Sequence, residues 1–346
     1  MTANAPLRLA LDGEALVSNW RWLKARGGAA DCGAAIKADG YGLGAREVMR
    51  RLAAAGCRDF FVATWAEAAA LEPIAEARSL SVLHGVRAED MAQALSGRAR
   101  PVLSSVEQAA RWRDAGGGAC DLMIDTGMNR LGIDWRDDVA GISAGLRVGT
   151  VMSHLACADE DHALNGVQRA RFGEVSARVA AQRRSLANSA GICLGSDYAF
   201  DLTRPGLALY GGIPRGEATG ALRQVATPEA QVLQRRRARA GDSIGYGATL
   251  IAPADMELAV LNIGYADGYL RGFSGTGAVW AGGVKLTVAG RVSMDLLIVD
   301  CSAVPDLSEG DWVALDYDLT RASAQSGLSQ YELLTGLGKR FDRIWR

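Results

Sequence analysis

One lysine, Lys37, follows a short apolar run in the stretch AAIKADGYGLGA, residues 34–45. A lysine at the end of a buried strand commonly extends its ammonium group into water. The same amine, once deprotonated, binds an aldehyde as a Schiff base. Lys37 is therefore a candidate for covalent attachment of a carbonyl compound, provided that other groups of the right chemistry lie nearby.

Four more residues have chemistry that fits a phosphorylated aldehyde. The hydroxyl of Ser189, with backbone N–H groups near Gly206, suits a phosphate monoester. Gly206 also lets the backbone come close to a ligand. Arg204 supplies a permanent cation and His154 an imidazole. These positions are far apart in the sequence, so their joint function depends on the fold.

Short apolar runs alternate with amphipathic helical segments from residue 33 to about 212. Strands that alternate with helices predict a parallel sheet, and eight such units predict an α/β fold, the (β/α)8 TIM barrel. The eight runs are 33–38, 60–64, 79–85, 100–105, 120–126, 149–155, 184–191 and 204–212.

Barrel geometry predicts where the chemical groups lie, because such sites form at the carboxyl ends of the strands. Lys37 ends the first run, His154 the sixth and Ser189 the seventh, while Arg204 lies on the eighth. All four should meet at one mouth of the barrel. A lysine, a phosphate cradle and a buried arginine around one mouth suggest pyridoxal phosphate.

After about residue 215 the sequence pattern changes. The long helical segments end, and short alternating runs with glycine-rich turns follow. This pattern predicts a second, mainly antiparallel β domain. The first strand candidate, PLRLALD, lies outside the eight-unit count, so we expect it to pair with that domain. The predicted domains are 9–215 for the barrel and 216–346, with an N-terminal strand at about 1–8, for the β domain.

Composition limits the possible partners. The 346 residues carry a net charge of −1, and 49% of them are apolar, so neither a nucleic acid nor a membrane is expected as a partner. The sequence has no recognisable signal peptide or membrane span, which predicts a cytoplasmic protein. The run HLACADEDH fits no standard zinc spacing, and no metal site is predicted.

Nine stretches, in the same order along the chain, resemble the alanine racemase family. The resemblance covers essentially the whole chain and implies a barrel followed by a β domain, with pyridoxal phosphate as cofactor. The stretches are AIKADGYGLGA (35–45), IDTGMNRLGI (124–133), SHLACADE (153–160), ANSAG (187–191), TRPGLALYG (203–211), SIGYGATL (243–250), IGYADGY (263–269), GRVSMD (290–295) and YELLTGLGKR (331–340).

The resemblance implies two catalytic bases, Lys37 and Tyr246. Racemisation needs two, because a proton removed from one face of the α-carbon must return on the other. By family analogy Lys37 takes the α-proton of the D-amino acid and Tyr246 that of the L-amino acid. The implied reaction is the interconversion of L-alanine and D-alanine on a pyridoxal phosphate external aldimine. This isomerase activity supplies D-alanine for peptidoglycan or serves alanine catabolism.

Arg204 resembles the arginine that contacts the pyridine nitrogen of the cofactor, and His154 resembles a residue that supports this arginine by hydrogen bonding. Arginine stays protonated and so leaves that nitrogen unprotonated, which favours racemisation. Related barrel decarboxylases have a glutamate there. For the phosphate, the resemblance points to Tyr41, Ser189, Tyr331 and the backbone of Gly206 and Leu207.

For the substrate carboxylate, the resemblance points to Arg130 and the backbone of Met294. Tyr265 resembles a residue that lines the access channel, with Asp295 nearby. In this family the residues matching Tyr246 and Met294 reach the cofactor from the partner subunit. The resemblance therefore implies a head-to-tail homodimer with shared active sites.

One departure from the family pattern concerns Met123. Many members have a lysine here, seven residues before Arg130, and its carbamylated, negatively charged form positions the arginine. Methionine carries no charge. We expect a bound anion such as chloride, or a neighbouring polar side chain, to orient Arg130 instead.

Two alternative functions stay open. A broad-specificity or serine racemase would use the same residues, because one or two pocket side chains control substrate range. A non-catalytic pyridoxal phosphate carrier would consist of the bare barrel and would need no second base. A zinc-dependent D-serine dehydratase is disfavoured, because the chain has no histidine after residue 162.

Overall fold

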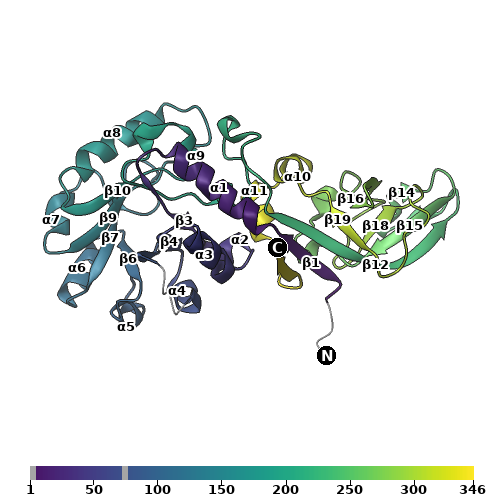
Figure 1. Cartoon of the computed structure of the whole chain (residues 1–346), viewed down its shortest axis with the longest axis horizontal. Coiled ribbons are helices and arrows are strands. Elements are labelled where there is room, and N and C mark those ends of the chain that lie inside the picture. The colour runs from purple at the N-terminus through teal and green to yellow at the C-terminus, as the bar shows by residue number, and fades with distance from the viewer. Residues whose placement is uncertain (1–4, 72–76) are drawn as a thin grey trace. The chain divides into compact units, whose positions relative to one another are not determined.

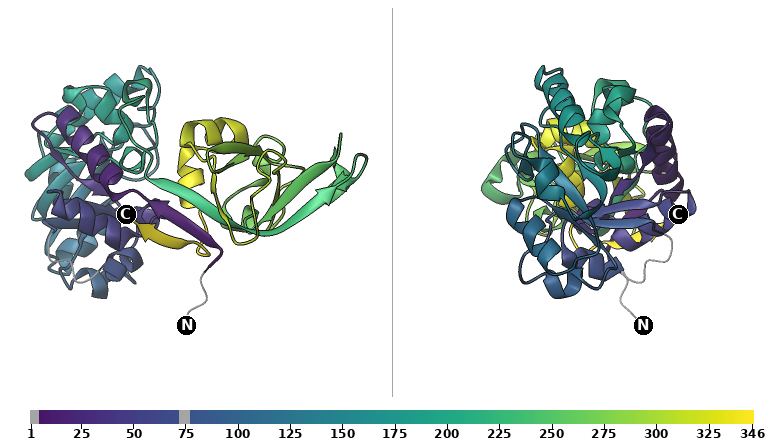
Figure 2. Two further views of the ribbon diagram at one scale, coloured as in Figure 1. Left: turned by 45° about the vertical axis from the view of Figure 1, so that its right-hand side comes forward. Right: turned by 90° about the vertical axis from the view of Figure 1, so that its left-hand side faces the viewer.

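The computed structural model describes residues 5–71 and 77–346 and divides into two compact units (Figures 1 and 2). One unit is Ala15–Arg223, and the other combines the chain up to Glu14 with Gln224–Arg346. The divisions fall a few residues later than the sequence-based boundaries. Residues 1–4 of the predicted N-terminal strand lie outside the described part.

The first unit is the predicted (β/α)8 barrel. Its parallel strands follow the order β3-β4-β5-β6-β7-β9-β10, and β11 pairs in parallel with β2. The barrel closes there, because the amides of Asp31 and Gly33 donate to the carbonyls of Asp201 and Thr203, both at 2.9 Å. The strands are β2 (Asp31–Cys32), β3 (Ala34–Ala35), β4 (Asp59–Val62), β5 (Ser79–Val82), β6 (Arg100–Leu103), β7 (Ala119–Asp125), β9 (Arg147–Met152), β10 (Ala181–Ser185) and β11 (Leu202–Thr203), and the short β8 (Ile133–Asp134) pairs with β7.

Helices surround these strands (Figure 2, right). Each longer helix buries one apolar face, as Val48, Met49 and Leu52 show in α3. Within residues 5–71 and 77–346, no helix has the length and apolarity needed to cross a membrane. The helices are α1 (Gly13–Arg26), α2 (Lys37–Tyr41), α3 (Ala45–Ala54), α4 (Trp65–Leu71), α5 (Met91–Ala94), α6 (Val106–Asp114), α7 (Val139–Ser143), α8 (Leu164–Ser176) and α9 (Ser189–Cys193).

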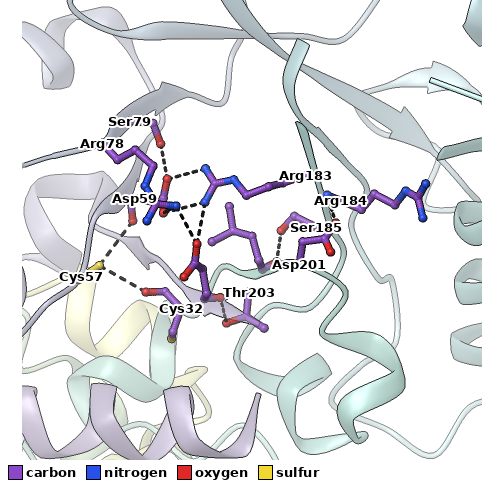
Figure 3. A network of polar contacts seen from close by, with 12 residues as sticks. Cys32, Cys57, Asp59, Arg78, Ser79, Arg183, Arg184, Ser185, Asp201 and Thr203 are labelled. Atoms are coloured by element: carbon purple, nitrogen blue, oxygen red, sulfur yellow. Dashed lines mark hydrogen bonds and ion pairs between the residues drawn. The ribbon is translucent and has the colours of Figure 1, made fainter. Parts of the chain in front are cut away.

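A charged network occupies the amino-terminal end of the barrel strands (Figure 3). Arg183 on β10 donates two hydrogen bonds to Asp59 on β4, at 2.7 and 3.0 Å. Ser79 on β5 donates to the same carboxylate at 2.7 Å, and Arg78 pairs with Asp31 at 2.7 Å. Strands β2, β4, β5 and β10 are thus linked by ion pairs and hydrogen bonds as well as by apolar packing.

Two strands differ from the sequence-based prediction. Strand seven is Ala181–Ser185 rather than 184–191, and Arg183, which was expected to end the preceding helical segment, lies on this strand and pairs with Asp59. Strand eight is only Leu202–Thr203 rather than 204–212. The amides of Gly206 and Ala208 bond to the Ser189 hydroxyl, and the chain turns into a 3-10 helix.

The second unit is the predicted, mainly antiparallel β domain. Strand β1 (Leu7–Leu11) pairs antiparallel with the long β12 (Ala226–Ala238) and parallel with β20 (Asp342–Trp345), which confirms the expected pairing of PLRLALD (Figure 1). Its other elements are β13 (Ser243–Ile244), β14 (Leu250–Ile251), β15 (Met256–Leu261), β16 (Ala278–Ala281), β17 (Val284–Thr287), β18 (Leu297–Asp300), β19 (Trp312–Leu315), α10 (Leu319–Ser326) and α11 (Gln330–Thr335).

Candidate active site

Lys37 is half-buried and begins α2, two residues after β3, so it lies just beyond the strand it was expected to end. The backbone after it is unusual. Ala38, Asp39, Gly40 and Tyr41 all have positive φ values, between 52° and 64°. A non-glycine residue in this left-handed region costs about 1–2 kcal/mol. Such strain persists only where the surroundings hold it, and it is concentrated at functional sites.

Glu67 is one of the groups that hold this turn. Its carboxylate accepts the Ala38 amide at 2.7 Å and, through its other oxygen, the Ala63 amide at 2.6 Å. Asp39 fixes the far side of the turn by accepting the Ala45 amide at 2.9 Å. Sequence analysis missed Glu67, because it lies on α4 and no local pattern connects it with Lys37.

The environment of Lys37 favours the neutral amine. Burial lowers its pKa, and the positive charge of Arg130 lowers it further, while Glu67 opposes the shift. A lysine must lose its proton before it can attack an aldehyde or accept a proton. The structure therefore prepares Lys37 for the chemistry that its position suggested.

Tyr41, Ser189 and Gly206 lie together in the fold. The Ser189 hydroxyl accepts the amides of Gly206 and Ala208 at 2.9 and 3.2 Å. A Cβ atom on Gly206 would lie only 2.1 Å from the Tyr41 hydroxyl, so no larger residue fits there. Ser189 is the first residue of α9 rather than the end of a strand, and Leu207 follows Gly206. Hydroxyl groups and backbone amides of this kind suit a phosphate group.

Arg204 is buried directly after β11. It donates to the Ser185 hydroxyl and, at 2.5 Å, to the Ser153 carbonyl. Both acceptors are uncharged, and burial lowers the pKa of Arg204 to about 10, with Asp121 opposing the shift. The guanidinium is therefore a cation held by neutral groups.

His154 lies two residues beyond β9. Burial, followed by the charges of Arg204, Arg130 and Lys37, lowers the pKa of His154 to about 3. Its imidazole is thus neutral at any physiological pH. Among the described residues, the hydrogen bonds of Arg204 go to Ser185 and Ser153, and none joins it to His154, in contrast to the support that the family resemblance implied.

Arg130 is exposed in the loop that follows β7. Asp125, the last residue of β7, shapes this loop by accepting the amides of Gly127, Met128 and Arg130 at 2.8, 2.9 and 3.0 Å. Met123 is buried earlier on the same strand. The Asp-Thr-Gly sequence is a turn signal that could have identified Asp125 from the sequence.

Three cations lie at this end of the barrel. Within residues 5–71 and 77–346, none of Lys37, Arg130 and Arg204 takes part in an ion pair. A buried charge without a partner, such as that of Arg204, is costly, so the arrangement fits an anionic ligand. Pyridoxal phosphate, with a phosphate group and a phenolic oxygen, has the required charge, and Lys37 can bind its aldehyde.

The other predicted site residues belong to the β unit. Tyr246 begins a short 3-10 turn and is 70% exposed, and Met294 is 53% exposed. The glycines on both sides of Tyr246 approach Arg291, so the Tyr246 turn lies beside the segment that leads to Met294. Tyr331 lies in the first turn of α11 and is 45% exposed.

Tyr265 and Asp295 flank the Met294 segment. The Tyr265 amide donates to the Ser293 carbonyl and the Ala266 amide to the Met294 carbonyl, both at 3.0 Å. Two backbone hydrogen bonds thus join the Tyr265 loop to Met294. In the described part of the chain, no three His, Cys, Asp or Glu side chains are grouped as metal ligands would be.

Comparison with known proteins identifies both units. The family described as "Alanine racemase, N-terminal domain" matches residues 11–214, and "Alanine racemase, C-terminal domain" matches residues 225–345. A biosynthetic alanine racemase of Agrobacterium fabrum is 40% identical over 98% of this chain and 93% of its own. A catabolic alanine racemase of the same organism is also 40% identical, over 97% of this chain and 91% of its own.

A solved structure agrees with these matches. The alanine racemase from Bartonella henselae, with covalently bound pyridoxal phosphate, superimposes with a TM-score of 0.91 at 35% sequence identity. The match covers 99% of this chain and 100% of the Bartonella chain.

Proposed function

Because the chain belongs to the alanine racemase family, we propose that it interconverts L-alanine and D-alanine with pyridoxal 5′-phosphate as cofactor. The observation that carries the proposal is the cluster of cations at the carboxyl ends of the barrel strands. Lys37, Arg130 and Arg204 lie there without ion-pair partners among the described residues, and Lys37 has a lowered pKa. Cations without ion-pair partners can bind the phosphate of a phosphorylated aldehyde and the carboxylate of a substrate.

The barrel has a residue to bind each part of the cofactor. Lys37 would hold the aldehyde, and the cradle of Tyr41, Ser189 and Gly206, with the Leu207 amide, would hold the phosphate. Arg204 would donate to the pyridine nitrogen. Because a guanidinium cannot readily give up its proton, that nitrogen stays unprotonated. The β unit would add Tyr331 to the phosphate ligands.

Two bases would then move one proton. Bound pyridoxal phosphate acidifies the α-hydrogen of the amino acid attached to it. The Lys37 amine accepts or returns a proton on one face of the α-carbon, and the Tyr246 hydroxyl does so on the other. One base removes the proton and the conjugate acid of the other supplies one, so the configuration inverts. Arg130 and the Met294 amide would hold the substrate carboxylate during the transfer.

We also propose that the working enzyme is a head-to-tail homodimer in which each β unit completes the partner's site. The exposure of Tyr246 and Met294 supports this, because large apolar side chains exposed on one chain commonly lie at interfaces. Tyr265 and Asp295 would line the access channel. The cytoplasmic location stays a prediction from the sequence.

The orientation of Arg130 is a separate proposal. Met123 carries no charge, and the Asp125 carboxylate holds the backbone of the Arg130 loop rather than its guanidinium. We propose that a bound anion such as chloride occupies the place of the missing negative charge. A crystal structure that shows the Arg130 guanidinium held only by neutral groups, with no anion nearby, would contradict this.

The activity is tested by incubating the purified holoenzyme in deuterated water with single L-amino acids. Deuterium should enter the α-position of alanine faster than that of serine or lysine. Serine exchange as fast as alanine exchange would favour the broad-specificity or serine racemase instead. The biosynthetic and catabolic relatives match equally well, and one equilibrating activity serves both the supply of D-alanine for peptidoglycan and its removal.

Tyr246 distinguishes a racemase from a carrier and also tests the dimer. Tyr246→Phe should lower racemisation by about 10²- to 10⁴-fold and leave cofactor binding unchanged. If Tyr246 acts across the dimer, subunits with Lys37→Ala and subunits with Tyr246→Phe should complement each other when they are unfolded and refolded together. Random pairing gives one intact site in half of the dimers, or about a quarter of wild-type activity. A mixture that stays inactive would place both bases on one chain.

A further inference from the structure

Three loops of the β unit meet at one arginine, Arg340. They are residues 264–268, which include Tyr265, residues 293–295, which include Met294, and residues 336–340, which follow α11. Two of the loops carry residues proposed to contact the substrate or line its path. The third continues from the helix that carries Tyr331.

Arg340 bridges two carboxylates. Its Nε and Nη2 atoms donate to the two oxygens of Asp267 at 2.6 and 2.7 Å, and its Nη1 atom donates to Asp295 at 2.7 Å. Asp267 is fully buried, whereas Asp295 is half-exposed. One planar guanidinium therefore fixes two segments that lie 28 positions apart in the sequence, Asp267 and Asp295.

Asp267 links Arg340 to the backbone of the Tyr265 loop. Its carboxylate also accepts the Gly264 amide at 3.0 Å, and its carbonyl accepts the Gly338 amide at 3.2 Å. A Cβ atom on Gly264 would lie 2.3 Å from the Met294 carbonyl oxygen, so only glycine permits this approach. The backbone around Met294 is thus packed directly against the loop that Arg340 holds.

Charge gives Arg340 a second effect. Asp295 is adjacent to Met294, whose amide is proposed to bind the substrate carboxylate. An uncompensated Asp295 would repel that anion, because like charges close to each other near a protein surface interact unfavourably. The contact with Arg340 cancels this charge locally and leaves the Met294 amide accessible to an anion.

We propose that Arg340 is a positioning residue for substrate binding, which both holds the Met294 segment against the Tyr265 loop and neutralises Asp295. The inference rests on the proposed function, since it takes the Met294 amide as a carboxylate-binding group. It does not require Arg340 to touch the substrate, the cofactor or the reacting atoms.

The test compares Arg340→Gln with wild-type holoenzyme. The KM for alanine should rise about tenfold and kcat should change less than about threefold, because the loss affects carboxylate binding rather than proton transfer. The dissociation constant for propionate, which is alanine without its amino group, should rise by the same factor when followed by the absorbance of the bound cofactor. Arg340→Lys should give an intermediate value, because one ammonium group cannot bridge both carboxylates.

Rescue separates the charge effect from simple misfolding. Asp295→Asn added to Arg340→Gln should restore part of the KM and of the propionate affinity, since the uncompensated Asp295 charge is gone while Asp267 still lacks its arginine. Arg237→Gln, which breaks an exposed ion pair with Asp255 in the same unit, is the matched control and should leave both values unchanged.

Two outcomes would overturn the inference. One is an Arg340→Gln enzyme with lowered thermal stability but wild-type KM and propionate affinity, which would make Arg340 purely structural. The other is a raised KM that Asp295→Asn does not lower at all. If wild-type enzyme does not racemise alanine, the proposed function fails instead, and the propionate titration still reports on Arg340.

Discussion

The two ends of the barrel treat buried charge in opposite ways. At the amino-terminal end, Asp59 and Arg183 neutralise each other, and Asp31 and Arg78 do the same (Figure 3). At the carboxyl end, Lys37 and Arg204 have no ion-pair partner among the described residues. At one end the charges pair with each other, and at the other, within the described residues, these cations do not pair with a carboxylate.

This difference shows which end is scaffold and which end binds. In a network whose charges pair with each other, no charged group is left to bind a ligand. Such a network fixes how the strands pack. Cations left with neutral acceptors, beside a strained turn and a glycine cradle, indicate a ligand site. We therefore expect that removing a charged side chain at the amino-terminal end destabilises the apoprotein. Removing one at the carboxyl end should mainly weaken cofactor binding.

The largest effect is expected from Lys37→Ala, which removes the proposed covalent attachment point. Activity should fall by at least about 10³-fold, and the cofactor absorbance near ~420 nm should disappear because no Schiff base can form. Lys24→Ala is the control, since Lys24 lies over the Trp20 ring on α1. The chain has four lysines, at positions 24, 37, 285 and 339, so peptide mapping after borohydride reduction identifies the modified residue. Label on another lysine would show that Lys37 is wrongly assigned.

The next effect concerns stability at the amino-terminal end. Asp59→Asn leaves Arg183 with only its longer contact to Asp31, at 3.3 Å, and we expect it to lower the free energy of unfolding of the apoprotein by about 3 kcal/mol. Urea unfolding measures this. The cofactor absorbance of the folded variant should match that of wild type. A variant as stable as wild type would contradict the view that the charges at the amino-terminal end stabilise the barrel.

Arg204→Met, at the carboxyl end, should change the stability of the apoprotein little and weaken cofactor binding. The change removes hydrogen bonds to Ser185 and Ser153 but also removes the cost of burying an unpaired cation, so the apoprotein should change by less than about 2 kcal/mol. The rise in melting temperature on adding pyridoxal phosphate should become smaller than in wild type. Strong destabilisation of the apoprotein would show that Arg204 belongs to the scaffold.

The smallest effect is a pH dependence. Burial raises the pKa of Asp59, but hydrogen bonds from Arg183 and Ser79 outweigh it, and the net pKa is lowered. A carboxyl group with a lowered folded-state pKa stabilises the fold above its unfolded value of about 3.9 and loses this contribution as the pH falls through the folded value. The stability difference between wild type and Asp59→Asn should therefore be constant from pH 5 to 7 and shrink below about pH 4. Melting curves at each pH measure it, and a constant difference down to pH 3 would contradict it.

Much of the fold and part of the site could be predicted from local sequence patterns. Alternating apolar runs and helical segments predicted the barrel, and the change of texture near residue 215 predicted the β unit. Strand seven was misplaced because its inward residue is Arg183, whose burial depends on Asp59, 124 positions away. A local pattern has no information about such a partner.

The sequence by itself determined which residue types are present and in what order, and these carry the resemblance that points to Lys37, Arg204 and Tyr246. Only the tertiary structure decided their surroundings. It showed that Glu67 holds the left-handed turn after Lys37, that neutral serines hold Arg204, and that Arg340 joins two loops of the β unit. The reason is physical, because pKa, strain and ion pairing depend on neighbours brought together by folding, and those neighbours are distant in the chain.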